Sequence, residues 1–114
     1  MGALRQIRTA RLHRDQIAEY RRLHDNIPDL IVKHLIEAGY TDVQIYLHDD
    51  VLVMLTEFDS KETVPDRSVD DAAERDWHSK TGACFSSEWQ VANKIFDIRD
   101  TLKQGQWGHE RDPS

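Results

Sequence analysis

The 114-residue sequence has one cysteine, Cys84, and five glycines, none of them in a glycine-rich run. A single cysteine cannot form a disulfide within the chain, which excludes a disulfide-stabilised scaffold. Isolated glycines exclude the glycine-rich loops that bind phosphate groups. A catalytic role for Cys84 would need a histidine beside it, and a buried or partly buried free thiol is the more common state of such a residue. We therefore interpret Cys84 as structural.

Long apolar runs and an excess of positive charge are also missing. No stretch approaches the roughly 20 apolar residues that a membrane-spanning helix needs. The first residues lead into charged side chains and not into the apolar segment of a secretory signal, so the cytoplasm is the expected compartment. The net charge of −6 disfavours binding to nucleic acid, which requires a basic surface.

Metal-binding motifs are missing as well. The six histidines are scattered, and neither Cys-x-x-Cys nor His-Glu-x-x-His occurs. The sequence therefore predicts no metal site and no cofactor.

The composition that remains is that of a globular protein. Hydrophobic residues make up 39% of the chain and charged residues 32%, which is typical of a soluble domain. The length predicts a single domain. We place this domain at residues 1–98 and expect residues 99–114, which are mostly polar, to form a mobile tail.

The spacing of apolar residues predicts seven elements. Strands are expected at 4–12, 43–48, 51–58 and 91–98, and helices at 14–25, 28–38 and 68–82. Pro28 suits the first position of a helix, and Gly39 suits a left-handed stop. Ser68 with Asp71 resembles a capped helix start. The pair of strands around Asp49-Asp50 predicts a β-hairpin.

This order is βαββαβ when the first two helices are counted as one interrupted connection. It predicts an α+β, ferredoxin-like fold with an antiparallel sheet that helices cover on one face. The other face commonly needs a partner in this fold, and we therefore expect a homodimer. The fold itself does not specify a function.

Two side chains of the first helix could carry chemistry. Tyr20 and His24 are four residues apart and share one helix face. Histidine titrates near neutral pH and can therefore transfer protons in both directions. Ordinary packing of the pair at a helix end is the alternative. Trp77 is either a core residue or a flat platform for the apolar face of a sugar. Trp89 and Trp107 are interpreted as surface or interface residues.

At this point an ordered set of segments resembles the L-rhamnose mutarotase family over residues 4–98. The set is Glu19-Tyr20-Arg21-Arg22-Leu23-His24, Pro28-Asp29-Leu30, Ala38-Gly39, Ile45-Tyr46-Leu47, the strand at 51–58, Arg75-Asp76-Trp77 and Phe96. Each segment alone is unspecific, and the resemblance lies in their order.

The resemblance implies a dimeric α+β barrel with a sugar pocket in each subunit and no cofactor. The substrate would be a 6-deoxy-hexose such as L-rhamnose or L-fucose, whose α and β anomers the enzyme interconverts. The acid/base role would belong to His24 and sugar contacts to Tyr20 and Trp77. Further wall residues would be Tyr46, Val43 and Asp76. Val43 and Asp76 depart from the aromatic residues that the family has there, and Ile27 replaces a tryptophan.

Three other classes remain open from the sequence, and one of them, a purely structural dimer, would bind no sugar. A ferredoxin-like dimeric monooxygenase would share the fold, but it would bind haem or consume oxygen. A non-enzymatic sugar-binding module would bind a sugar without accelerating any reaction of it.

Overall fold

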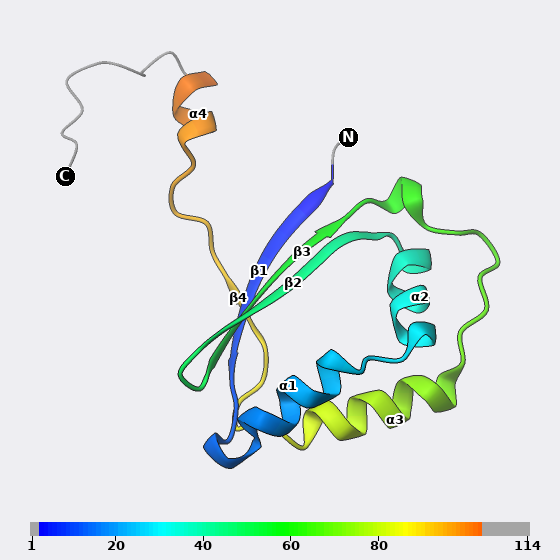
Figure 1. Ribbon diagram of the computed structural model, residues 1–114. Coiled ribbons are helices and arrows are strands. Elements are labelled where there is room, and N and C mark those ends of the chain that lie inside the picture. The colour runs from blue at the N-terminus through cyan, green and yellow to red at the C-terminus, as the bar shows by residue number, and fades with distance from the viewer. Residues whose placement is uncertain (1–2, 104–114) are drawn as a thin grey trace.

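The computed structural model describes residues 3–103, which form a four-stranded antiparallel sheet with helices beside it (Figure 1). The elements are β1 (Leu4–Arg11), η1 (Arg14–Gln16), α1 (Ile17–Asp25), α2 (Asp29–Ala38), β2 (Tyr40–His48), β3 (Val51–Phe58), η2 (Ser60–Glu62), α3 (Asp71–Gly82), β4 (Gln90–Ala92) and α4 (Ile98–Lys103). The predicted α+β, ferredoxin-like architecture is confirmed.

The strand order is β2-β3-β1-β4, so β1 lies between the hairpin and the last strand. The hairpin is confirmed, and Asp49 at its turn has a φ of 58°, a left-handed conformation that aspartate tolerates better than most residues. β1 pairs with β3 along its whole length, from Leu4 opposite Phe58 to Arg11 opposite Val51. The register therefore fixes which side chains share a face of the sheet.

One face of the sheet packs against α1 and α3. Ala10 and Leu52 are opposite each other in the β1–β3 register, and both are buried. Because side chains alternate along a strand, Thr9 and Val53 must point to the other face. No helix among residues 3–82 covers that outer face in Figure 1.

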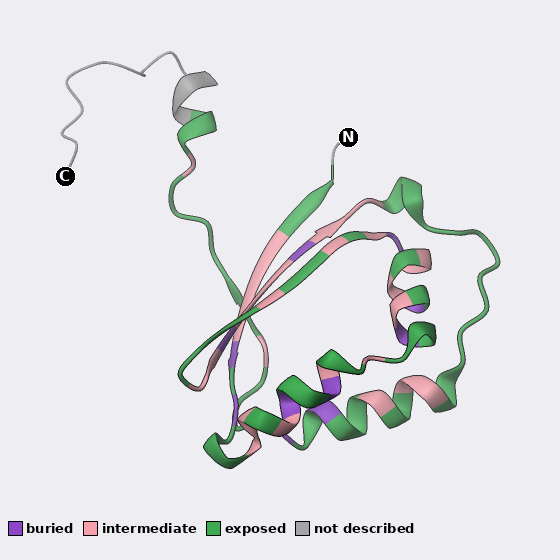
Figure 2. Cartoon of the chain, viewed as in Figure 1, coloured by how far each residue is buried: buried purple, intermediate pink, exposed green. Residues whose placement is uncertain are grey.

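The core lies between the sheet and the helices, where the buried segments of Figure 2 face one another. Its fully buried members are Leu12, Tyr20, Leu23, Leu52 and Cys84. Cys84 is 1% exposed, which confirms the predicted buried thiol, and burial raises its pKa. A protonated, enclosed thiol is a poor nucleophile, and this agrees with a structural role.

Both ends of α2 depend on special backbone positions. Pro28 is the cap residue and Asp29 the first helical residue, so the helix begins one residue later than predicted. Gly39 ends it with a φ of 119°, as the sequence predicted. A Cβ at Gly39 would lie 2.9 Å from the carbonyl oxygen of Asp59 and from the Phe58 ring, so only glycine fits without displacing neighbours.

The start of α3 differs from the prediction. The cap is Asp70, whose carboxylate accepts a hydrogen bond from the Ala73 amide at 3.0 Å, and Ser68 lies outside the helix. The Asp70 amide in turn donates to Nε2 of buried His34, while His34 Nδ1 donates to Glu74. These contacts fix Asp70 in place, which explains why it and not Ser68 caps the helix. They also join α2 to the first turn of α3.

The predicted strand at 91–98 is wrong over most of its length. β4 ends at Ala92, and the chain then leaves the sheet, so Ile95 is 97% exposed. Residues 93–97 have no regular secondary structure, and α4 follows them. α4 lies well apart from the other helices in Figure 1. The predicted boundary between domain and tail, at 98/99, falls inside α4, and Trp107 and the rest of the predicted tail lie outside the described residues.

Candidate functional site

Two stretches that are distant in the sequence meet at one end of the core: α1, and α3 with the loop that follows it. α1 supplies Tyr20 and His24, α3 supplies Trp77, and the loop at 83–89 closes the end. The loop is held against the end of β1, where the Ser86 amide donates to the Arg11 carbonyl at 2.9 Å and the Arg11 amide donates to Ser87 Oγ at 2.8 Å. The site therefore has a fixed frame built from backbone hydrogen bonds.

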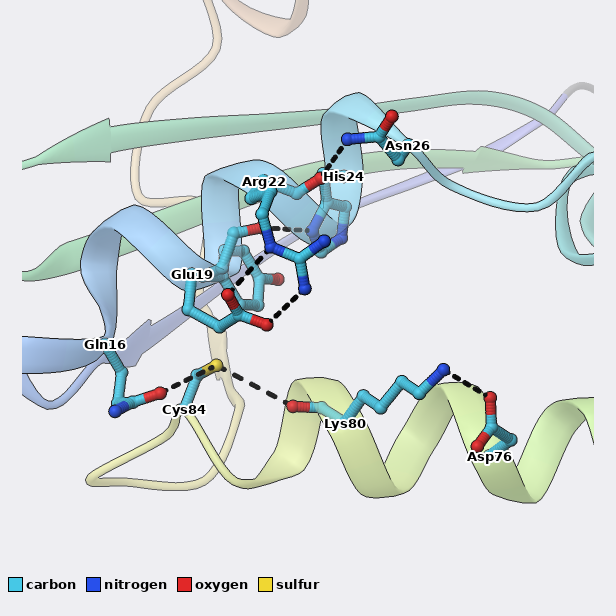
Figure 3. A network of polar contacts seen from close by, with 9 residues as sticks. Gln16, Glu19, Arg22, His24, Asn26, Asp76, Lys80 and Cys84 are labelled. Carbon is cyan, nitrogen blue, oxygen red and sulfur yellow. Dashed lines mark hydrogen bonds and ion pairs between the residues drawn. The ribbon is translucent and has the colours of Figure 1, made fainter.

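The imidazole of His24 is oriented by its own helix. Nδ1 lies 3.0 Å from the carbonyl oxygen of Tyr20, one turn earlier, as Figure 3 shows. A carbonyl oxygen can only accept a hydrogen bond, so Nδ1 carries the hydrogen and Nε2 is the nitrogen that can take up or release a proton. Among residues 3–100, whose side chains the structure describes, none is a hydrogen-bond partner of Nε2 of His24. The ring is thus prepared for proton transfer through one defined atom.

Aromatic rings hold the imidazole from two sides. The His24 ring lies 4.3 Å from the Tyr20 ring and 5.1 Å from the Trp77 ring, measured between centroids. Tyr20 also makes an edge contact with Phe85, which makes another with Trp89. Tyr20 and His24, which their spacing places on one helix face, lie side by side, and Trp77 of α3 contacts the same imidazole.

Tyr20 is buried, and burial raises the pKa of its phenol, with a smaller contribution from the charge of Cys84. The hydroxyl therefore stays protonated throughout the physiological range and can donate a hydrogen bond. No residue of the described part of the chain accepts it. A ligand in the adjoining cavity is thus a possible acceptor.

We call the hollow beside these rings the aromatic cavity; its volume is about 680 Å³. Its aromatic lining is Tyr20, Trp77, Phe85 and Trp89, and its aliphatic lining is Ile27, Leu35 and Met54. Its polar side chains are His24, His78, Thr81, Ser87 and Glu88. A largely apolar cavity with a few polar groups is typical of sites for small organic ligands.

A second hollow, the edge cavity, lies on the β2 side of the same two residues and has a volume of about 430 Å³. It is lined by Tyr20, Arg21, His24, Asp25, Ile45, Tyr46, Leu47 and Leu52. Tyr20 and His24 therefore separate two cavities. The aromatic cavity also contains Trp77, so it brings together the three residues that the sequence singled out most strongly.

The remaining predicted wall residues lie elsewhere. Asp76 forms an ion pair with Lys80 at 2.9 Å along α3 (Figure 3), and it lines a groove on the far side of Trp77, together with Glu19 and Arg22. Tyr46 lines the edge cavity, but its hydroxyl donates to Gln44, two residues away on the same strand.

Val43 lies in β2 opposite Thr56 and is not part of the lining of either cavity that contains His24. None of Val43, Tyr46 and Asp76 therefore lies beside His24 in the aromatic cavity.

Several residues of the aromatic cavity were not predicted as site residues. Trp89, interpreted from the sequence as a surface or interface residue, packs against the core and lines the cavity. Phe85 and Glu88 come from the same loop, whose residue types show no periodicity. One sequence signal could have suggested a partly buried loop. Two aromatic residues, Phe85 and Trp89, flank the polar residues Ser86, Ser87 and Glu88.

Neither a metal-binding cluster nor a membrane span is found in the described chain. No three His, Cys, Asp or Glu side chains between residues 3 and 103 are grouped as ligands of a metal ion. No helix in the same range is long and apolar enough to cross a bilayer.

The fold and the cavity together define a small α+β protein with a histidine-containing, aromatic-lined site. The sequence profile of the L-rhamnose mutarotase family matches residues 5–102, and the chain belongs to that family. Members are isomerases that act on sugar anomers, as the resemblance of the ordered segments implied. No curated protein sequence matches the chain.

Solved structures share the fold of this chain. An L-rhamnose mutarotase from Formosa agariphila is similar, with a TM-score of 0.66, 14% identity, and coverage of 82% of this chain and 97% of that one. A candidate antibiotic biosynthesis monooxygenase from Bordetella bronchiseptica has a TM-score of 0.56 and 16% identity, with coverage of 84% and 100%. At such identities the similarity establishes the fold alone.

Proposed function

We propose that the protein interconverts the α and β anomers of a 6-deoxy-hexose, with L-rhamnose as the first candidate and L-fucose as the second. The family assignment supports a sugar mutarotase. The orientation of His24 is the main structural support for this proposal. Its Nδ1 donates a hydrogen bond to the Tyr20 carbonyl, which leaves Nε2 available to a ligand in the aromatic cavity.

Mutarotation opens the pyranose ring and closes it again on the other face of C1. Opening removes the proton of the anomeric hydroxyl and delivers a proton to the ring oxygen, while the C1–O5 bond breaks and C1=O1 forms. Closing reverses each of these steps. A histidine suits this chemistry because the reaction has little driving force and must run in both directions at neutral pH. We assign one of the two proton transfers to Nε2 of His24.

The other lining residues would hold the sugar. Trp77, Phe85 and Trp89 offer flat apolar faces that can stack on C–H groups, including the 6-methyl group of a deoxy sugar. The protonated Tyr20 hydroxyl would donate a hydrogen bond to a sugar oxygen. Asp76, Val43 and Tyr46, which the family resemblance placed in the wall, would then contribute less than these residues.

The test is anomer exchange measured by saturation-transfer NMR on L-rhamnose and on L-fucose, with wild type and His24→Ala. We expect wild type to accelerate exchange on at least one sugar and the variant to lose most of the acceleration, about 100-fold or more. His48→Ala is the matched control and should behave as wild type, because His48 is exposed at the end of β2 and lines neither cavity that contains His24. If wild type matches buffer on both sugars, this proposal is wrong for them, and a sugar-binding module or the oxygenase class takes its place.

We further propose that the protein is a homodimer that buries the outer face of the sheet. That face carries Ile7, Val53 and Leu55, which are only partly covered within one chain. Burial of such a face is favourable by about 25 cal/mol per Å² of apolar surface. Sedimentation equilibrium should give twice the chain mass for wild type, and Val53→Asp should shift the protein toward monomer. A monomeric wild type at all concentrations would refute the dimer without affecting the proposed activity.

A further inference from the structure

Ring opening needs two proton-transfer groups, and the proposed function assigns only one of them. The second must lie in the same cavity as His24 and carry a group that can accept and release a proton. Tyr20 is unsuited to accept one in its neutral form, because burial keeps its phenol protonated. Asp76, which the family resemblance placed in the cavity wall, is also unsuited, because it pairs with Lys80 and lines the other groove beside Trp77.

Glu88 meets these requirements. Of the described residues that line the aromatic cavity, it alone carries a carboxylate. Among residues 3–100, whose side chains the structure describes, none forms an ion pair or hydrogen bond with its carboxylate. A carboxylate on the cavity wall without a protein partner is available to a ligand.

The backbone on both sides of Glu88 is held in place. Ser87 accepts a hydrogen bond from the Arg11 amide through its side chain, and Trp89 packs against the core with an edge contact to Phe85. The chain is therefore anchored on both sides of Glu88, which is itself an exposed residue of the cavity lining. Such anchoring matters because proton transfer needs a heavy-atom approach of roughly 2.6–3.2 Å.

We propose that Glu88 is the second acid/base residue of the anomerisation and acts opposite His24. This inference rests on the proposed mutarotase function. In ring opening, the Glu88 carboxylate takes the proton from O1, the O1–H electron pair forms the C1=O1 bond, and the C1–O5 pair moves to O5. O5 receives the proton of Nε2 of the His24 imidazolium. Closing returns the proton from O5 to Nε2 and the carboxylic proton to O1, so both residues regain their starting states.

The test compares Glu88→Gln and Glu88→Ala with wild type and His24→Ala in the anomer-exchange assay. Glu88→Gln should lower kcat about 100-fold and change KM little, because the amide keeps the shape but cannot accept the proton. Added formate should restore part of the rate of Glu88→Ala, which a purely structural role would not allow. Glu62→Gln, an exposed acid in η2 away from the cavity, is the matched control and should behave as wild type.

The two proposals fail in different ways. A wild type without activity on any sugar removes the proposed function and this inference with it. An active wild type with an equally active Glu88→Gln overturns the role of Glu88 alone. If Glu88→Gln is slow but formate does not rescue Glu88→Ala, the role of Glu88 is also overturned. The same holds if the circular dichroism of Glu88→Gln differs from wild type, because the residue would then support the loop and not the proton transfer.

Discussion

The indole of Trp77 meets the imidazole of His24 at 67°, an edge contact with 5.1 Å between the ring centroids. This contact joins α3 to α1 at the site, and it gives Trp77 two roles, since the same ring packs against the core and lines the aromatic cavity.

Trp77→Ala should therefore weaken sugar binding more than it slows the chemistry. An aromatic contact contributes about 0.5–1.5 kcal/mol beyond simple burial, so KM should rise up to about tenfold. Steady-state kinetics by NMR at several sugar concentrations would measure this. Trp77→Phe, which keeps a ring, should recover most of the loss. An unchanged KM in the Ala variant would contradict a role of Trp77 in the sugar site.

Tyr20 should make stability depend on pH at the alkaline end. Its pKa is raised in the folded protein, so the folded state holds the phenolic proton more tightly than the unfolded state does. This contribution is complete below the unfolded value of about 10 and is lost as the pH rises toward the folded value. Wild type should lose thermal stability between pH 9.5 and 11, and Tyr20→Phe should lose less (a range set about the unfolded pKa). Equal slopes for the two proteins would show that the phenol does not contribute.

The buried imidazole of His34 should contribute to stability through both of its nitrogens. It is 5% exposed, and it accepts from the Asp70 amide at 3.2 Å while it donates to Glu74. His34→Ala should lower the free energy of unfolding by about 2–4 kcal/mol, because a buried side chain is lost and the Asp70 amide and the Glu74 carboxylate lose their partner. His78→Ala is the control, since His78 contacts the same Glu74 from the surface and should cost under about 0.5 kcal/mol. Urea unfolding would measure both, and similar losses would contradict the role of burial.

Two glycines should respond to alanine with opposite signs. At Gly39, with its φ of 119°, a Cβ would lie 2.9 Å from three neighbouring atoms, so Gly39→Ala should cost more than about 1 kcal/mol. At Gly82, the last residue of α3, a Cβ would meet nothing within 4 Å, so Gly82→Ala should be neutral or stabilising by up to about 1 kcal/mol. Thermal unfolding of the two variants would check this. A destabilised Gly82→Ala would mean that the end of α3 needs glycine for another reason.

The sequence predicted the parts of the fold that local rules control. The hairpin around Asp49 follows from alternation, and the stop at Gly39 follows from the need for a left-handed residue. The cap of α3 could not be predicted in the same way. Asp70 is held there by His34, which is 36 residues away in the sequence, so a local comparison with Ser68 was insufficient.

The site was predictable only in part for the same reason. Tyr20 and His24 share a helix face, which spacing shows, but the loop that carries Glu88 and Trp89 reaches them through hydrogen bonds to Arg11. The prediction of a strand after Ala92 was wrong for a different reason. Ile95 has a strand-forming residue type, but β4 ends at Ala92 and Ile95 is 97% exposed, so residue type alone was not enough to predict a strand there.

The pairing of β4 with β1 also has a consequence for biosynthesis. β1 gains its neighbour on one side only when β4 has been synthesised, and the loop at 83–89 forms hydrogen bonds with the end of β1. Domains are built from the N-terminus as the ribosome releases the chain. The nascent protein can therefore form its hairpin and first helices early, but the wall that carries Glu88 can close only after almost the whole domain has emerged. A half-made chain would leave His24 facing water, without a finished pocket.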